Sequence, residues 1–329
     1  MNLNIIDLLN KEGEALQELF RKANSIRTKV LGNGIFLRGL IEFSNKCSGS
    51  CLYCGLNKNN KTIQRYTLSK EEILSAVDKV QSCNIKSIVL QSGEDKNLDP
   101  DFLADVIVTI KKKYDIAITL SVGEKDRETY SLWKQAGADR YLLKIETIDA
   151  EIYSKLHPNM SLENRMNCSG ILKSLGYQNG SGLLIGLPNQ TYETIAKDIQ
   201  YIADNKFDMV GIGLFIPHKG TALSDLPTGN LNTVLKTLAI LRILLPTANM
   251  PATTAIGSLE EDYRPLALNA GANVIMPNFT PHEYKKLYEI YPNKKCTSED
   301  PKEIISSLDV MVKSIGRYLD FSRGDACQS

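Results

Sequence analysis

The feature that most constrains the fold is an alternation of short apolar runs with helical segments, which begins after Gly34. Most of these runs are continuously apolar, which is typical of strands that are covered on both faces. Eight strand–helix units over about 250 residues predict an α/β fold, a (βα)8 TIM-type barrel, and an open doubly wound sheet is the competing arrangement. The candidate strands cover residues 35–43, 87–91, 116–121, 141–145, 182–186, 209–215, 250–254 and 273–276.

Local signals place the ends of several helices. Ser, Asp and Pro residues mark helix starts, and glycines mark helix ends, because a glycine tolerates the left-handed conformation that helix ends often need. These signals are a capping box at Ser69 and Glu72, N-cap and proline pairs at Asp99–Pro100 and Asp300–Pro301, and terminal glycines at Gly137 and Gly271.

No linker or composition shift divides the chain, so we expect one compact unit in three parts. Residues 1–34 should form an N-terminal helical extension, 35–290 the barrel, and 291–329 a C-terminal helical tail that packs outside the barrel or over its mouth.

Composition excludes several classes of protein. With 39 Lys and Arg against 38 Asp and Glu, the net charge of +1 gives no field that would attract nucleic acid or an anionic membrane. No apolar run is long enough to span a bilayer, and the N-terminus lacks the features of a secretory signal. Seven cysteines, three of them crowded together, do not resemble a disulfide framework. We therefore expect a cytoplasmic protein without a nucleic-acid or membrane partner.

The crowded cysteines are Cys47, Cys51 and Cys54, in the loop that follows the first candidate strand. Barrel enzymes place their chemistry in such loops. Thiolates at these spacings can bind three corners of an iron–sulfur cubane, which leaves the fourth iron open to a ligand with an amine and a carboxylate, such as S-adenosylmethionine (SAM). A structural zinc site would need a fourth ligand, normally from a second C-x2-C pair. Three unrelated core cysteines are the other alternative.

This segment resembles the signature of the radical SAM superfamily, C-x3-C-x2-C with an aromatic residue, here Tyr53, before the third cysteine. Within the superfamily, the chain resembles the FeFe-hydrogenase maturases of the HydE family, in the branch that includes biotin synthase. The resemblance runs from about Phe36 to Tyr288. It is carried by blocks at residues 41–44, 51–56, 89–95, 119–121, 123–124, 137–143, 163–165, 209–213, 215–218, 251–255 and 271–278.

The resemblance implies a 4Fe–4S cluster with SAM at the carboxyl mouth of the barrel. Ser121, Glu146 and Arg165 should contact SAM, and Ser92 and Glu94 belong to a loop that resembles the superfamily's G-G-E motif for the SAM amino group. An arginine can bind the methionine carboxylate bidentately, and a carboxylate can accept hydrogen bonds from an amine or ribose. A Glu146–Arg165 salt bridge at the barrel rim is the structural alternative.

The resemblance also implies an inner substrate pocket. In it, Arg140 and Lys144 would steer an anionic or metal-carbonyl-cyanide substrate, although Arg140 also fits a surface charge at a strand end. Lys144 stands where relatives often have arginine, and lysine cannot make the same bidentate contact. The implied pocket residues are Gln91, Arg140, Lys144, Thr253, Thr254, Met276 and Tyr288.

The remaining cysteines and histidines are expected to be structural. Some relatives hold a second cluster near the C-terminus, but only Cys296 remains in that region, so no second cluster is expected. Cys83 and Cys168 lie in helical patterns as small core residues. The three histidines each lie next to a proline in a loop, where a structural role is the default; they are His157, His218 and His282.

Three functions remain open. The first is FeFe-hydrogenase maturation, in which an adenosyl radical acts on a cysteine-ligated iron carbonyl cyanide precursor, with other maturases and an electron donor such as ferredoxin or flavodoxin as partners. The second is another radical SAM reaction, such as methylornithine synthesis or biotin-type sulfur insertion. The latter needs extra cluster ligands, and the strand ends offer Ser92 and Ser121 instead of cysteines. The third is a non-catalytic barrel that carries metal.

Overall fold

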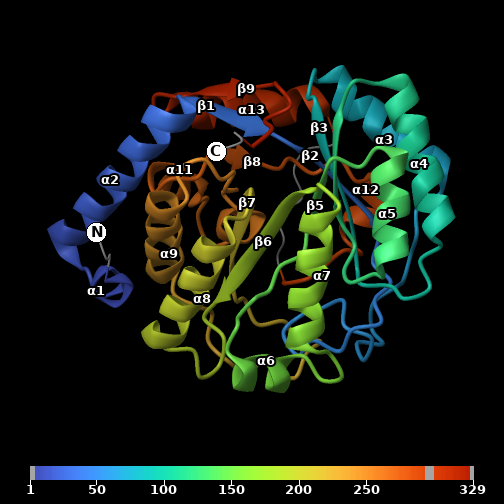
Figure 1. Cartoon of the computed structure of the whole chain (residues 1–329). Coiled ribbons are helices and arrows are strands. Elements are labelled where there is room, and N and C mark those ends of the chain that lie inside the picture. Colours follow the sequence, from blue (N-terminus) through green and yellow to red (C-terminus); the bar gives the residue numbers. More distant parts are fainter. Residues whose placement is uncertain (1–3, 293–299, 327–329) are drawn as a thin grey trace.

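The computed structural model describes residues 4–292 and 300–326. Strands and helices alternate along most of the chain, and the helices flank the strands on the outside (Figure 1). The strands are β1 (Gly34–Leu37), β2 (Gly39–Ser44), β3 (Ser87–Ser92), β4 (Ala117–Ser121), β5 (Arg140–Leu142), β6 (Gln178–Ile185), β7 (Met209–Leu214), β8 (Val274–Ile275) and β9 (Tyr318–Asp320).

The helices begin and end largely where capping signals occur. The capping box at the start of α3, the Asp–Pro starts of α4 and α13, and the left-handed glycine at the end of α5 are all confirmed. The helices are α1 (Ile5–Leu9), α2 (Gly13–Leu31), α3 (Lys70–Ser82), α4 (Pro100–Lys113), α5 (Arg127–Ala136), α6 (Ala150–Leu156), α7 (Leu162–Ser174), α8 (Tyr192–Asn205), α9 (Leu231–Leu244), α10 (Thr254–Gly257), α11 (Arg264–Asn269), α12 (His282–Lys285) and α13 (Pro301–Lys313).

The expected TIM-type architecture is confirmed. Strands β2 to β7 form a six-stranded parallel sheet in chain order. Isolated parallel bridges join the two edges of this sheet, because Met209 pairs with Asn249, Pro251 with Val274, and Leu40 with Asn278. The carboxyl ends of all these strands therefore point to the same side, which is where a TIM-type barrel carries its active site.

Three details differ from the sequence prediction. The expected strand 35–43 is split into β1 and β2, and β1 pairs with β8 and β9 in a separate three-stranded sheet. The expected strand 250–254 makes only bridge contacts, because α10 begins at Thr254. Strand β9 was not expected from the sequence.

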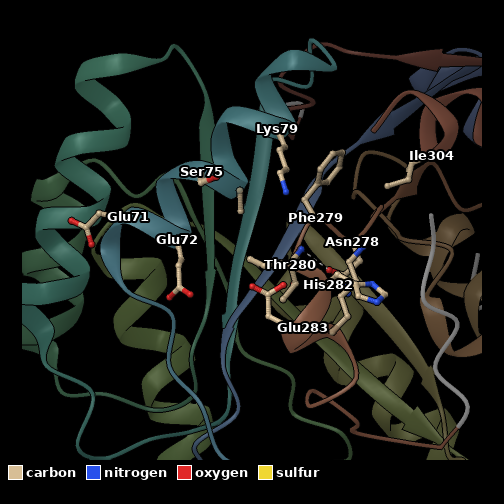
Figure 2. Close-up of a pocket in the computed structure, with 13 residues that line it drawn as sticks. Glu71, Glu72, Ser75, Lys79, Asn278, Phe279, Thr280, His282, Glu283 and Ile304 are labelled. Carbon is tan, nitrogen blue, oxygen red and sulfur yellow. Dashed lines mark hydrogen bonds between the residues drawn. The ribbon is translucent and has the colours of Figure 1, made fainter. Parts of the chain in front are cut away.

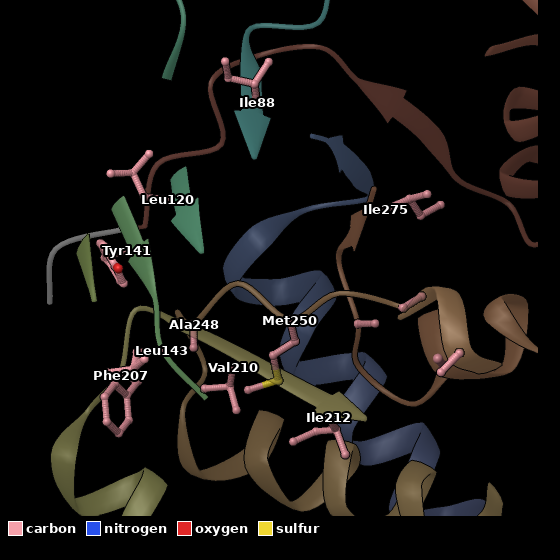
Figure 3. Close-up of a cluster of buried hydrophobic side chains, with 14 of the residues drawn as sticks. Ile88, Leu120, Tyr141, Leu143, Phe207, Val210, Ile212, Ala248, Met250 and Ile275 are labelled. Atoms are coloured by element: carbon pink, nitrogen blue, oxygen red, sulfur yellow. The ribbon is translucent and has the colours of Figure 1, made fainter. Parts of the chain in front are cut away.

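The core is one large hydrophobic cluster between the sheet and the helices. Figure 3 shows side chains from separate strands that share this cluster. Ile88, Leu120 and Tyr141 are completely buried on β3, β4 and β5, and Val210 is completely buried on β7. Burying such side chains stabilises the fold by about 1.5–3 kcal/mol each for the aliphatic ones.

The two chain ends cover different parts of the barrel. Helices α1 and α2 pack against α8 and α9 on one flank (Figure 1). The segment after β9 crosses the amino ends of the strands, where the carbonyl of Gly324 accepts hydrogen bonds from Arg38 (3.3 Å) and Asn249 (3.1 Å). The tail therefore closes the end of the barrel opposite the active-site side. The expected division at residues 34 and 290 stays a prediction.

In the part of the chain that the structure describes, no helix combines the length and apolar character needed to cross a membrane.

Candidate active site at the carboxyl end of the barrel

The loop between β2 and α3 carries the three crowded cysteines, and Arg65 fixes its shape. The Arg65 guanidinium donates to the backbone carbonyls of Asn45 and Leu56 at 2.7 Å each. It also donates to the carbonyls of Asn57 (2.7 Å) and Asn60 (3.3 Å). One side chain thus ties together both ends of the cysteine loop, and its positive charge stays beside the thiols.

The three sulfurs face two different spaces. Cys51 and Cys54 line an inner cavity, whereas Cys47 lines a hollow on the outer surface. A Cβ on Gly49 would lie 3.4 Å from Cys47 Sγ and 3.7 Å from Cys51 Sγ, so the loop folds closely around this glycine. Burial raises the pKa of all three thiols, that of Cys54 to about 12. Without metal they are therefore protonated, and metal binding must release their protons.

The chemistry of this donor set fits an iron–sulfur cluster. Cysteine thiolates are the usual ligands of such clusters, whereas a structural zinc ion is closed by four ligands. Among the described residues, no group of three or more His, Cys, Asp or Glu side chains is arranged to hold a single metal ion. Cys47, Cys51 and Cys54 would hold the cluster, and two of them, Cys51 and Cys54, line the inner cavity.

The segment 156–160, which begins at the last residue of α6, contacts four consecutive residues of the cysteine loop. The contacts are Ser50 Oγ to Pro158 O (2.6 Å), Cys51 Sγ to Met160 Sδ (3.7 Å), Leu52 N to Leu156 O (2.9 Å) and Tyr53 Oη to His157 Nε2 (2.8 Å). The other ring nitrogen of His157 lies 3.0 Å from the Tyr153 carbonyl, so it carries the proton and Nε2 accepts from Tyr53. Burial lowers the pKa of His157, which favours this neutral form.

An inner cavity of about 350 Å³ opens among the carboxyl ends of the strands. It brings together most of the residues that sequence reasoning singled out, from loops far apart in the chain. The expected residues that line it are Cys51, Tyr53, Cys54, Gln91, Ser92, Glu94, Ser121, Lys144, Glu146, Arg165, Thr253, Thr254 and Met276. Cys47, Arg140 and Tyr288 are the expected residues that do not line it.

Arg165 lies at the cavity wall between two carboxylates. Its Nη1 is 3.1 Å from Glu94 Oε2, and its Nε is 3.0 Å from Glu124 Oε1. Burial alone would lower the pKa of Arg165, but these carboxylates raise it well above its ordinary value. Burial also raises the pKa of Glu124, which Arg165 partly offsets. The arginine is therefore charged and can exchange a protein carboxylate for a ligand carboxylate.

Glu146 pairs with Lys144, not with Arg165, so the expected structural alternative of a Glu146–Arg165 bridge is wrong. Lys144 Nζ lies 2.8 Å from Glu146 Oε2, and both side chains line the cavity. Glu146 has φ +65°, a left-handed conformation that costs a non-glycine residue about 1 kcal/mol or more. Such strain is typical of functional sites, and here it lies beyond the end of β5, where Glu146 makes an isolated parallel bridge with Leu183 of β6.

Two glycines make room for this arrangement. A Cβ on Gly93, between Ser92 and Glu94, would lie 2.3 Å from the carbonyl of Lys46, so only glycine allows this loop to approach the cysteine loop. A Cβ on Gly182 would lie 2.1 Å from the carbonyl of Gly211 and 2.9 Å from Cε of Lys144. The glycine in β6 therefore leaves the space that the Lys144 side chain occupies.

Deeper in the cavity, polar groups are few. Gln91 donates to the hydroxyl of Tyr288 at 3.1 Å, so the buried Tyr288 lies behind Gln91 instead of at the cavity surface. The Thr253 hydroxyl lies 3.4 Å from the Ile212 carbonyl, and Met276 completes the wall. A mainly apolar wall with isolated polar groups is typical of small-molecule sites.

Arg140 is in a different place from the one expected. It lies at the amino end of β5, completely buried, and its Nη2 is 2.5 Å from Asp325 Oδ1 in the C-terminal tail. It also donates to Ser87 Oγ (2.9 Å) and Gln178 Oε1 (3.1 Å). The expectation that Arg140 faces the substrate pocket is therefore wrong, because the strand directs it to the opposite end of the barrel.

The other cysteines and histidines lie away from the cavity lining. Cys168 is buried within α7, as expected, and Cys83 is the half-buried C-cap of α3. His218 is buried, with Nε2 3.3 Å from Glu289 Oε2. Cys296 and Cys327 lie outside the described residues.

A second hollow, of about 410 Å³, lies outside the sheet between α3 and the segment 278–285. Figure 2 shows Glu71 and Glu72 on one side of it and His282 and Glu283 on the other. Among the described residues, its lining contains no cysteine and none of the expected site residues.

Sequence reasoning missed three supporting residues. Arg65 has no local pattern that marks it, and Glu124 lies in one of the blocks that carry the resemblance but has no expected role, because the partners of both residues are distant in sequence. His157 is expected only as a structural histidine beside Pro158, and nothing in the sequence connects it with Tyr53. Only the fold brings them together.

Comparisons with known proteins show the family and the fold. The radical SAM superfamily matches residues 41–202. The chain is 46% identical to the [FeFe] hydrogenase maturase subunit HydE of Thermotoga maritima, over 92% of this chain and 86% of that protein. It is 33% identical to a 3-methylornithine synthase of Methanosarcina acetivorans, over 82% of this chain and 76% of that protein. The crystal structure of methylornithine synthase (PylB) superimposes with a TM-score of 0.84 at 28% identity, covering 96% of this chain and 93% of that chain.

These matches explain the cysteine loop and cavity together, since the superfamily uses a 4Fe–4S cluster and SAM. The chain is a radical SAM enzyme, and it belongs to the radical SAM superfamily as a close relative of the hydrogenase maturase HydE.

Proposed function

We propose that this enzyme acts in the assembly of the FeFe-hydrogenase active site, on a cysteine-ligated iron carbonyl cyanide precursor. The strongest support is the combination of 46% identity to HydE with a cavity that holds Cys51, Arg165, Glu146 and Lys144 in one space. Other maturases, a low-potential electron donor such as ferredoxin or flavodoxin, and a cytoplasmic setting go with this proposal.

When bound, the cluster and SAM supply a 5′-deoxyadenosyl radical by reductive cleavage of a carbon–sulfur bond. Cys47, Cys51 and Cys54 hold the cluster as thiolates. Arg165 takes the methionine carboxylate, because its charge is fixed by Glu94 and Glu124 beside the cavity.

Other groups around the cavity orient SAM. Glu94, with Ser92, accepts hydrogen bonds from the SAM amine, and Glu146, with Ser121, accepts them from the ribose hydroxyls. Tyr53, held by His157, supplies an aromatic surface beside the third cysteine. These contacts fix where the radical forms and exclude water from it.

The inner wall of Gln91, Lys144, Thr253, Thr254 and Met276 receives the substrate, and Tyr288 orients Gln91 from behind. Lys144 is the cation of this wall that can meet an anionic substrate. A single ammonium group binds an anion as a point charge, without the bidentate geometry of arginine.

Anaerobic reconstitution with iron and sulfide tests the chemistry. We expect iron–sulfur absorbance and 5′-deoxyadenosine formation from SAM, both lost in Cys51→Ser and both retained in the matched Cys83→Ser, which changes a cysteine outside the cavity. The chain should also restore hydrogenase activity in a strain that lacks its own HydE-type maturase. Cleavage of SAM without restoration would contradict the maturase role but not the radical SAM chemistry.

Methylornithine synthesis is the second candidate. It is favoured by the backbone agreement with PylB, at a TM-score of 0.84. Formation of 3-methylornithine by the reconstituted protein, together with failure to restore hydrogenase activity, would favour it over maturation. Biotin-type sulfur insertion has less support, because Ser92 and Ser121 stand at the strand ends that line the cavity.

A further inference from the structure

The outer face of the cysteine loop is an unassigned surface. Whereas Cys51 and Cys54 line the inner cavity, Cys47 lines a surface hollow of about 330 Å³. A cluster held by all three cysteines would therefore lie between the cavity and the outside. The hollow is lined by Lys46, Cys47, Ser48, Arg65, Asp95 and Asn97, and we call it the basic hollow.

Cations gather around the basic hollow. Lys46, Lys58 and Lys96 are exposed, and none of them forms an ion pair with a residue at positions 4–292 or 300–326. Two are tied to the cysteine loop itself, since the Lys58 amide donates to Gly49 O (2.8 Å) and the Lys96 amide to Ser48 Oγ (3.1 Å). The lysines therefore flank the segment that contains Cys47.

Arg65 adds a charge that no carboxylate neutralises among its hydrogen-bond partners, because its guanidinium donates to backbone carbonyls. Asp95 is the acidic residue in the lining of the basic hollow. The whole chain carries a net charge of only +1, so this excess of cations is local. A local patch of one sign steers a partner of opposite sign and raises its association rate.

We propose that the basic hollow docks an acidic, low-potential one-electron carrier protein, which reduces the cluster through its Cys47 side. This inference rests on the proposed function. In the step, one electron leaves the reduced carrier, which is oxidised by one unit, and enters the cluster, which is reduced by one unit. No atom or proton moves between the two proteins.

The arrangement separates two tasks. SAM and substrate bind from the cavity side, where Cys51 and Cys54 lie, and the electron arrives from the outside, where Cys47 lies. A docked carrier therefore does not block the cavity.

The test compares two reductants on the reconstituted protein. The triple variant carries Lys46→Glu, Lys58→Glu and Lys96→Glu. The matched control carries Lys22→Glu, Lys29→Glu and Lys197→Glu, so the net charge changes equally in both. The control lysines are also exposed, on α2 and α8. Cluster reduction is followed by absorbance, with a reduced acidic ferredoxin or with reduced methyl viologen, a small cation.

In the triple variant, reduction by ferredoxin should slow by about 10-fold or more at low ionic strength, the range expected when electrostatic steering is lost. Reduction by methyl viologen should not slow, and the control should match the wild type with both reductants. Equal ferredoxin rates in the triple variant and the wild type would overturn the docking proposal while leaving the proposed function intact. Absence of SAM cleavage with either reductant in the wild type would instead contradict the proposed function.

A salt series on the wild type gives a second measurement if the triple variant fails to hold its cluster. Between about 0.02 M and about 0.5 M salt, the ferredoxin-driven rate should fall steeply, because screening shortens the reach of surface charge, while the viologen-driven rate should not fall. A ferredoxin-driven rate that is independent of salt would contradict the proposal.

Discussion

The two ends of the barrel each contain a buried arginine, with opposite surroundings. Arg165, at the carboxyl end, pairs with Glu94 and Glu124 but also lines the cavity. Arg140, at the amino end, is enclosed by its own strand neighbours and by Asp325 of the tail. The difference is access: a charge that reaches a cavity can change partners when a ligand binds, whereas an enclosed charge only holds the structure together.

This contrast gives the two ends different roles. In TIM-type enzymes the carboxyl end carries the chemistry and the amino end contributes stability. Here the cysteine loop and cavity occupy the first end, and the tail with Gly324 and Asp325 covers the second. Variants at the two ends should therefore separate ligand binding from stability.

The largest effect should follow Arg165→Lys. Lysine keeps the positive charge between Glu94 and Glu124 but cannot bind a carboxylate bidentately. Loss of one charge-assisted hydrogen bond is worth about 1.5–3 kcal/mol, so the Kd for SAM should rise by about 10–100-fold. Equilibrium binding of SAM to the reconstituted protein measures this Kd.

The matched control is Arg140→Lys. It should leave the Kd for SAM unchanged and lower the free energy of unfolding, since the fork of hydrogen bonds to Ser87, Gln178 and Asp325 is lost. If Arg140→Lys weakened SAM binding as much as Arg165→Lys, the proposed separation of the two ends would fail.

The sequence predicted those features of the two barrel ends that depend on local pattern. Continuous apolar runs placed β3, β4 and β7 within a residue or two, and the cysteine spacing located the loop that carries the chemistry. Most of the expected cavity residues lie at strand ends, so parallel strands bring them together once the architecture is known.

Long-range pairing could not be predicted. Strand β9 has three residues and an exposed Tyr318, too little pattern to mark a strand, and it forms only because β1 lies beside it. Asp325 has no motif that connects it with Arg140. The error over Arg140 was avoidable, because the expected strand began at residue 141 and so placed Arg140 at the amino end.

A smaller effect should follow Asp198→Asn. This variant tests whether a buried charged residue at the carboxyl end of the barrel serves ligand binding because of its position there or only when it lines the cavity. Asp198 on α8 is completely buried and does not line the cavity. Its Oδ1 accepts from the Thr147 hydroxyl (3.1 Å) and the Ile148 amide (2.6 Å), directly after Glu146. We therefore expect an effect on stability and little effect on SAM affinity.

The effect of Asp198→Asn on the free energy of unfolding should depend on pH. Burial raises the pKa of Asp198 from 3.8 to about 7. A carboxyl whose pKa is raised by folding contributes stability that is complete below pH 3.8 and lost as the pH rises through about 7. Asparagine never ionises, so relative to wild type the variant should gain about 2 kcal/mol in free energy of unfolding between about pH 5 and about pH 8. Urea unfolding measures this gain, and Asp204→Asn, exposed on the same helix, should show none.

The smallest effect should follow Asp325→Asn at the amino end. Burial alone would raise the pKa of Asp325, but the guanidinium groups of Arg140 and Arg323 bring it below its ordinary value of 3.8. Because the Asp325 side chain is 40% exposed, solvent screens the pair, and the variant should lose only about 1 kcal/mol of unfolding free energy at neutral pH.

Low pH should remove the difference in unfolding free energy between wild type and Asp325→Asn. A carboxyl whose pKa is lowered by folding contributes stability that is present above pH 3.8 and lost as the pH falls through its pKa in the folded protein. Wild type and Asp325→Asn should therefore converge in urea unfolding below that range, while Asp115→Asn, whose 86% exposed carboxylate also pairs with Arg323, should match wild type throughout. A loss for Asp325→Asn that persisted in acid would mean that the Asp325 side chain stabilises the tail through contacts that do not depend on its charge, such as the hydrogen bond it accepts from Gln178 Nε2 (3.1 Å), and not through the ion pair with Arg140.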